Sequence, residues 1–267
     1  MKKYIDNFMR YRFLLKELVV KGIKLKYRRS YLGLVWTLLE PLLTTMVLTF
    51  VFGNLLGRGD ALYPVYILSG RLLYSCFSSS SKIAMRSIRS NQAMIKKVYV
   101  PKYLYPLSSV LYNYILFLLS LIILALTAIV LKVPFTWHII EIFIPLTILF
   151  ILSIAAGLIL STVCVFFRDL EYLWEVVLML IMYCSAIFYK IDAIGEATKQ
   201  VLKFNPLYCV ISNFRCVLIY KGSIFTSYTF GLSELKMMLY SLGFGIAALI
   251  LGIVMFKKNQ DKFILHI

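Results

Sequence analysis

A basic stretch gives way abruptly to an apolar one near residue 30, and this junction constrains the fold more than any other feature. Four of the six residues from Lys24 to Arg29 are basic, whereas Glu40 is the only formal charge between Arg29 and Arg58. Lysine and arginine favour the cytoplasmic side of a membrane, and about 20 apolar residues cross its hydrocarbon core. The junction therefore predicts that the chain enters a membrane here from the cytoplasmic side.

The composition of the whole chain also indicates an integral membrane protein. Its 267 residues are 61% hydrophobic, with a mean hydropathy of +0.85, whereas soluble domains are about 45–50% apolar. The net charge of +17 could suggest nucleic-acid binding, but the basic residues collect at the ends of apolar segments. The N-terminus has no short apolar core before a small-residue cleavage site, so we predict no cleaved signal peptide.

Residues 4–27 predict an amphipathic helix. Apolar side chains such as Phe8, Leu15 and Leu18 recur at helical spacing, and basic side chains fill another face. Because a membrane span follows directly, we expect this helix to lie in the headgroup layer of the membrane. The alternative is an ordinary cytoplasmic helix that packs on the protein's own body.

Six apolar segments predict membrane spans, at 34–57, 62–84, 103–131, 139–167, 172–189 and 237–256. The loop 82–102 contains six basic residues and no acid, and residues 90–99 could form a short helix before Pro101. With this loop, both termini and the turn at Arg168 in the cytoplasm, twenty of the 29 lysines and arginines are cytoplasmic. We therefore predict an all-α membrane protein with cytoplasmic N and C termini, in one domain over 1–267.

Residues 190–234, between the fifth and sixth spans, have a different character. An apolar run from Leu207 to Tyr220 is too short to cross a membrane, and Asn205-Pro206 marks a break between two short helices. We predict a short re-entrant helix pair on the external side. Cys209 and Cys216 could share one helical face, and whether they pair is left open. No residue spacing in the chain resembles a metal site.

The order of these features resembles the permease subunit of ABC-2-type exporters of lipid-linked polysaccharide, which export O-antigen, teichoic acid and other cell-wall glycans. The matching pieces span nearly the whole chain: Lys26–Gly33 with Trp36 and Glu40–Leu42, Val51–Gly53, Pro101-Lys102 with Pro106-Leu107, Phe167–Asp169, Ser185–Tyr189, and Asn205-Pro206 with Arg215. Two positions depart from the pattern. Ala186 stands where many relatives carry proline, and Arg71 stands where many carry an apolar residue.

The resemblance implies a homodimer of this subunit with two ATP-binding subunits in the bacterial cytoplasmic (inner) membrane. It implies that short cytoplasmic helices dock on those subunits, and that the first and fifth spans line the glycan path. It also implies a gate at the outer mouth, carried by Asn205, Pro206 and Arg215. This chain has no Gly-x-x-x-x-Gly-Lys-Ser/Thr loop to hold ATP phosphates. We expect no cofactor in this chain and the use of ATP and Mg by the partner subunit.

Basic residues could bind the pyrophosphate of a lipid-linked substrate, because guanidinium and ammonium groups suit phosphate oxygens. The candidates are Lys26, Arg28 and Arg29 at the inner headgroup level, and Arg71 within a span. The first three could instead bind ordinary anionic lipid, and Arg71 could form a structural pair with Glu40 or Glu141.

Two further groups of residues follow from the expected topology. Contacts with the ATP-binding subunit are expected at Lys96, Lys97, Arg168 and Asp169, although their charges could serve only to set topology. Aromatic rings that could stack on sugars in the path are Trp36, Phe50, Phe52, Trp174, Tyr183, Phe188 and Tyr189. The alternative for each ring is lipid-facing packing.

The expected function is export of polyprenyl-pyrophosphate-linked polysaccharide from the inner side across the cytoplasmic membrane. One alternative is an ABC-2 exporter of a drug or small lipophile. Another is a membrane-embedded glycosyl or acyl transferase, for which carboxylate pairs or a catalytic histidine near the membrane face would be expected. The sequence leaves open which glycan is carried and whether the source has one membrane or two.

Overall fold

The computed structural model describes residues 2–28, 30–55, 60–97, 100–134, 136–190, 195, 201–229 and 232–263. Within these ranges the chain is a bundle of helices with one two-residue β pair, which agrees with the predicted all-α class. The elements are α1 (Lys2–Tyr27), η1 (Gly33–Val35), α2 (Trp36–Leu48), the π-helix η2 (Thr49–Leu55), α3 (Tyr63–Ser90), α4 (Gln92–Lys97), α5 (Leu104–Val130), η3 (Trp137–Ile142), α6 (Phe143–Phe166), α7 (Leu170–Tyr183), α9 (Pro206–Leu218), β1 (Tyr228–Thr229), β2 (Leu232–Ser233), α10 (Glu234–Asn259) and η5 (Gln260–Lys262).

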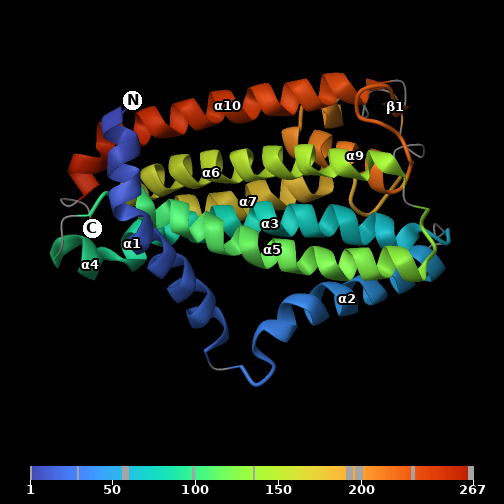
Figure 1. Cartoon of the computed structure of the whole chain (residues 1–267), viewed down its shortest axis with the longest axis horizontal. Coiled ribbons are helices and arrows are strands. Elements are labelled where there is room, and N and C mark those ends of the chain that lie inside the picture. Colours follow the sequence, from blue (N-terminus) through green and yellow to red (C-terminus); the bar gives the residue numbers. More distant parts are fainter. Residues whose placement is uncertain are drawn as a thin grey trace.

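The long helices α3, α5, α6 and α10 run along the long axis of the molecule (Figure 1). The short helix α4 lies at one end, near the C-terminus, and α9 lies at the other end beside β1. Helices α1 and α2 diverge from the bundle as the two arms of a V, joined by the turn before η1. Gly33 has φ +51° in this turn, a conformation that suits glycine.

Among the described residues, four helical stretches are both long enough and apolar enough to cross a membrane, namely Gly33–Gly53, Leu104–Val130, Trp137–Phe166 and Glu234–Lys262. Two of the six predicted spans do not meet both conditions. Helix α3 has 28 residues, but it contains Arg71, a run of serines and several basic residues. Helix α7 is apolar, but it has only 14 residues.

Helix α7 ends at Tyr183, although the fifth span was predicted to continue to residue 189. Ala186 has φ +49°, which an α-helix cannot contain. The chain here is held by α3 instead. Tyr66 Oη donates to the carbonyls of Ala186 (3.0 Å) and Tyr189 (2.8 Å). Residues 184–190, called the 184–190 segment below, are therefore an irregular segment that is hydrogen-bonded to α3.

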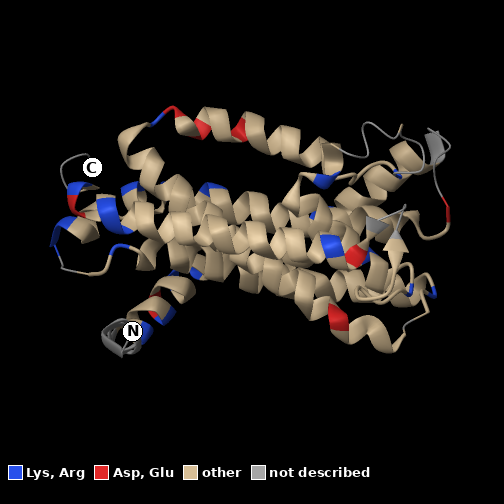
Figure 2. Cartoon of the chain, turned by 90° about the horizontal axis from the view of Figure 1, so that it is seen from above, with Lys and Arg blue, Asp and Glu red and all other residues tan. Residues whose placement is uncertain are grey.

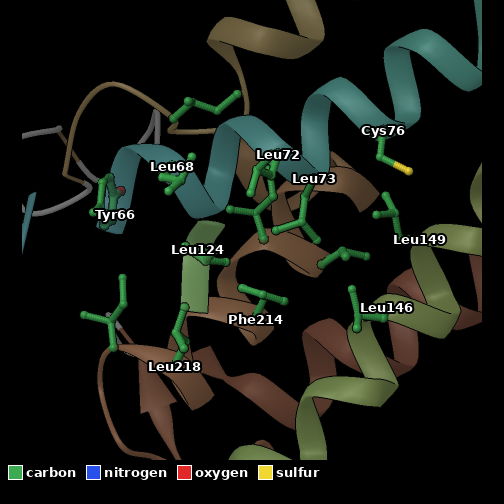
Figure 3. Packing of buried hydrophobic residues seen from close by; sticks show 14 of the residues in the cluster. Tyr66, Leu68, Leu72, Leu73, Cys76, Leu124, Leu146, Leu149, Phe214 and Leu218 are labelled. Carbon is green, nitrogen blue, oxygen red and sulfur yellow. The ribbon is translucent and has the colours of Figure 1, made fainter. Parts of the chain in front are cut away.

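The largest apolar core joins α3, α5, α6 and α9. Figure 3 shows part of it, with Leu72 and Leu73 of α3 near Phe214 of α9 and Leu146 of α6 close by. Every residue of α9 from Leu207 to Leu218 is buried. This 13-residue helix is too short to span the membrane, as predicted. The helix expected before Asn205 falls mostly on 191–194 and 196–200, outside the described residues.

Helix α1 confirms the predicted N-terminal helix, and its apolar residues divide between two environments. Leu15 and Leu18 are buried in a second core with residues of α3, α5 and α10. Phe13 is 70% exposed and Leu25 is 56% exposed. One part of the helix therefore packs on the protein's own body, whereas another part leaves apolar side chains uncovered.

Candidate functional site

A small polar cavity lies where the end of α1 meets α2, α3 and α5. Its volume is about 80 Å³, and its lining includes three charged side chains, those of Lys26, Glu40 and Arg71. The remaining polar lining includes hydroxyls and one amide, from Tyr27, Thr37, Ser75, Ser79, Ser120 and Asn113. Such a lining is unusual within a membrane bundle, because polar groups there are costly unless they serve one another or a ligand.

Arg71 of α3 is one of the two cations that line this cavity. It is half-buried and has no hydrogen-bond or ion-pair partner among the described residues. Glu40 lines the same cavity without forming an ion pair with it. Glu141 cannot serve as the partner, because its carboxylate accepts hydrogen bonds from Ser223 Oγ (2.9 Å) and the Ile224 amide (2.7 Å). The structural ion pair considered for Arg71 is therefore not formed.

Lys26 reaches the same cavity from α1. Its Nζ lies 5.7 Å from the centroid of the Tyr27 ring. Although much of Lys26 stays accessible, the surrounding helices partly desolvate its ammonium and lower its pKa, a shift that the Glu40 carboxylate opposes. Arg28 is exposed and does not line the cavity, and Arg29 lies outside the described residues. Two of the four predicted phosphate ligands are thus brought together.

The predicted contact residues for an ATP-binding subunit are exposed at one end of the bundle. Lys96 and Lys97 project from α4, and Arg168 and Asp169 lie in the turn before α7. Figure 2 shows that many of the lysines and arginines gather at the end that carries the C-terminus, whereas the middle of the bundle is nearly free of charge. The arrangement agrees with a basic cytoplasmic face.

Two arginines of α3 connect this end to α7. Arg86 Nε lies 2.7 Å from Glu171 Oε2, and Arg89 Nη1 lies 3.1 Å from Glu171 Oε1. In the sequence these arginines stand out only as two of the six basic residues of the loop 82–102. Their partner is 82 or more positions away in the chain, so no local pattern could identify the pair.

Three of the predicted path aromatics meet at the end of the bundle opposite α4. The rings of Phe52 and Phe188 stack with centroids 5.4 Å apart, and Tyr183 lies 6.4 Å from Phe188. Tyr189 joins this group because its Oη donates to the Tyr183 carbonyl (2.5 Å). Trp36 and Phe50 are exposed elsewhere on η1–α2–η2.

Trp174 does not belong to that aromatic group. Its Nε1 donates to Ser81 Oγ (3.0 Å), and its ring packs against Phe77 of α3 with centroids 6.4 Å apart. Trp174 therefore attaches α7 to α3.

The predicted gate residues Asn205 and Pro206 form the start of α9. Asn205 Oδ1 accepts a hydrogen bond from the Leu207 amide (3.0 Å), and its Nδ2 donates to the Cys184 carbonyl (3.1 Å) and Ser185 Oγ (3.0 Å). Pro206 occupies the first helical turn, where no amide hydrogen is needed. One side chain thus caps α9 and fixes the 184–190 segment beside it.

Arg215, the charged residue of the predicted gate, is buried, with 3% exposure. Its guanidinium donates to the carbonyls of Ala186 (2.8 Å) and Tyr66 (2.9 Å) and lies 3.5 Å from the Tyr66 ring centroid. Gly70 provides the space, because a Cβ there would clash with Nη2 of Arg215. Arg215 therefore joins α9, α3 and the 184–190 segment.

Glu234 is a buried acid that the sequence analysis missed. It is fully buried and accepts hydrogen bonds from Ser212 Oγ (2.9 Å) and Asn213 Nδ2 (2.7 Å). It stands in the first turn of α10, where the helix dipole favours a negative charge. An acid directly before an apolar run was the available signal for a helix start. Cys209 and Cys216, on the same helix α9, are both free thiols.

Comparison with known proteins places the chain in a family. The sequence profile described as ABC-2 type transporter matches residues 14–219. Two Klebsiella pneumoniae proteins, each named O-antigen export system permease protein RfbA, are 28% and 30% identical over 91% of this chain and 90% of each relative. The Escherichia coli protein named polysialic acid transport protein KpsM is 22% identical over 91% of this chain and 92% of that protein. The chain therefore belongs to the ABC-2 type transporter family and is a multi-pass protein of the bacterial cytoplasmic membrane.

Proposed function

We propose that this chain is the permease subunit of an ATP-driven exporter of polyprenyl-pyrophosphate-linked polysaccharide across the cytoplasmic membrane. The observation that carries this proposal is the match, over 91% of the chain, to relatives named for O-antigen export. The chain is then a transport component and not a catalytic enzyme. ATP hydrolysis, with Mg²⁺, belongs to a separate subunit.

The polar cavity supports a pyrophosphate-bearing substrate. Lys26 and Arg71 face one space together with several hydroxyls, and Arg71 has no internal partner among the described residues. A pyrophosphate would supply the missing acceptors, because a guanidinium binds two phosphate oxygens at once. Arg28 and Arg29 would meet the headgroup first at the membrane surface, and Arg71 would receive it inside the bundle.

The proposed complex has two copies of this chain and two ATP-binding subunits. Each copy has six spans with both termini in the cytoplasm and α1 in the headgroup layer of the inner leaflet. The ATP-binding subunits contact Lys96, Lys97, Arg168 and Asp169, which are exposed at the basic end. Phe52, Tyr183, Phe188 and Tyr189 lie together at the other end. They would offer ring faces to the sugars as these leave.

Depletion of the chain in its native cell tests the export function. Polyprenyl-pyrophosphate-linked polysaccharide should accumulate inside the cell and disappear from the surface, and mass analysis would then identify the glycan. Unchanged length and surface abundance of the glycan, in a strain without a second exporter, would contradict the proposal. Loss of the polymer everywhere would indicate a biosynthetic enzyme instead.

One observation favours a second candidate, an exporter of a small lipophile. An apolar cavity of about 490 Å³ lies between α3, α6, α7, α9 and α10, and its lining includes Phe77, Leu152 and Phe244. A drug-sized molecule suits a cavity of this size and polarity. The two candidates are distinguished by which compound stimulates ATP hydrolysis in the reconstituted complex, a lipid-linked glycan or a small lipophile.

A further inference from the structure

Packing fixes α7 only weakly. Leu178 is its one buried residue, and large apolar side chains such as Tyr172 and Val176 are exposed. By contrast, α3 and α9 are buried along most of their length. Polar contacts must therefore contribute much of what holds α7 in position, whereas packing holds other helices of the bundle.

These polar contacts run from α7 to α3. Tyr74 Oη of α3 donates to the Leu178 carbonyl (2.9 Å), and Trp174 Nε1 donates to Ser81 Oγ (3.0 Å). After α7, the 184–190 segment continues the series, because its carbonyls accept hydrogen bonds from the hydroxyl of Tyr66. Helix α7 and the segment that follows it are thus attached to a single helix at several levels.

The contact nearest α4 is ionic. Glu171, in the first turn of α7, accepts from Arg86 at 2.7 Å and from Arg89 at 3.1 Å, one arginine on each carboxylate oxygen. The Glu171 side chain is 22% exposed and that of Arg89 is 31% exposed, whereas that of Arg86 is 54% exposed, so solvent screens the contact with Arg89 less than the contact with Arg86. Without the carboxylate, the two arginines would stand three residues apart on α3 and repel each other.

The position of the cluster connects it to the basic end of the molecule. Arg86 and Arg89 lie in the last turns of α3, and only Asn91 separates α3 from α4. The exposed Arg168 and Asp169 directly precede α7. A displacement of the corner between α3 and α4 therefore reaches α7 first through Glu171.

We propose that the Arg86–Glu171–Arg89 ion pair is the link through which movement of the α3–α4 corner is passed to α7. This inference rests on the proposed function, because the movement would come from an ATP-binding subunit docked near α4. The three are positioning residues and touch no substrate. Arg215 and Tyr66 attach the 184–190 segment to the far part of α3. Because the ionic link acts at the start of α7 and these bonds act just after its end, a movement of α3 should move α7 with it.

The test uses the complete complex with its ATP-binding subunits in proteoliposomes. Glu171→Gln keeps the size of the side chain and removes its charge. Basal ATP hydrolysis should be unchanged, whereas the glycan transported per ATP hydrolysed should fall about tenfold, a usual size for coupling between sites. Glu17→Gln is the control, because Glu17 is an exposed acid of α1 without an ion pair among the described residues. Equal transport per ATP in the two variants would overturn the inference.

A mutant cycle separates a coupling link from a general loss of structure. Arg86→Gln combined with Arg89→Gln should lower transport per ATP as much as Glu171→Gln does. Adding Glu171→Gln to that pair should cause no further loss, because all three act through one contact. If the loss of transport per ATP in the triple variant equalled the product of the losses in Glu171→Gln and in the arginine pair, the residues would not act through a single link. The arginine pair also supplies the test if Glu171→Gln reduces the amount of assembled complex.

A distance measurement separates failure of this inference from failure of the proposed function. Spin labels at Met179→Cys on α7 and Val254→Cys on α10 occupy exposed positions. Trapping the complex with ADP and vanadate should change the distance between them. Glu171→Gln should abolish that change and Glu17→Gln should keep it. A change that survives in Glu171→Gln overturns the link alone. No change in the labelled parent complex overturns the proposed function and the link together.

Discussion

Arg71 holds a permanent positive charge half-buried in the bundle, with no hydrogen bond or ion pair among the described residues. Such a charge costs about 2.5–3.5 kcal/mol on insertion scales. We therefore expect Arg71→Met to raise the unfolding temperature of the purified protein. The same change should raise the glycan concentration needed to stimulate ATP hydrolysis about tenfold or more, because it removes a charged hydrogen bond worth about 1.5–3 kcal/mol. Unaltered stimulation would exclude Arg71 from phosphate binding.

Gly70 lies against the buried guanidinium of Arg215, and substitutions at the two positions can measure how much this close packing contributes to stability. Gly70→Ala places a methyl group against the buried guanidinium and should destabilise the protein by about 1–3 kcal/mol in thermal unfolding. With Arg215→Ala added, the total loss should be smaller than the sum of the two single losses, because both changes disturb one contact. Gly243→Ala is the control. No atom lies within 4 Å of its added Cβ, so it should be neutral or stabilise by up to about 1 kcal/mol. Simple additivity of Gly70→Ala and Arg215→Ala would refute the contact.

At the scale of elements, the 184–190 segment depends on the left-handed conformation of Ala186. Proline requires φ near −65°, so Ala186→Pro cannot adopt the observed φ of +49°. We expect it to destabilise the protein by more than about 1 kcal/mol in thermal unfolding. Ala186→Gly, which suits this conformation, should be tolerated. If Ala186→Pro were as stable as the parent, the segment would have to adopt a different backbone path.

The elements also differ in how far the sequence could predict them. Helices α5, α6 and α10 follow from long apolar runs, because their hydrogen bonds are local and lipid requires a helix. The end of α7 could not be predicted, because Tyr66 and Arg215, distant in the chain, supply the bonds that replace the helix. The ion pair at Glu171 and the burial of Glu234 were missed for the same reason. Lys26 and Arg71 were both predicted as possible phosphate ligands, but their shared cavity could not be predicted, since α1 brings Lys26 there by packing on α5.

Across the molecule, the positions of the acidic residues separate exposed helix faces that suit lipid from exposed faces that suit protein or water. The exposed face of α10 has no charge between residues 239 and 254, which suits lipid. Helices α2 and α7 are also exposed, but they carry Glu40 and Glu175 on accessible positions. A carboxylate in a span should face protein or water and not hydrocarbon. In the proposed homodimer, the exposed faces of α2 and α7 would therefore suit the subunit contact or the aqueous path.

Thiol labelling tests this assignment of faces. Met179 lies one turn after Glu175 and is 58% exposed, and Val254 on α10 is 57% exposed. In the complete complex, Met179→Cys should react with a water-soluble maleimide or cross-link to the second copy, because its face borders the path or the partner. Val254→Cys should react only with a lipid-soluble reagent. The five native thiols are buried or half-buried, so the introduced thiol should react first. If the two positions reacted alike with the lipid-soluble reagent alone, α7 would face lipid, and the path would have to run elsewhere.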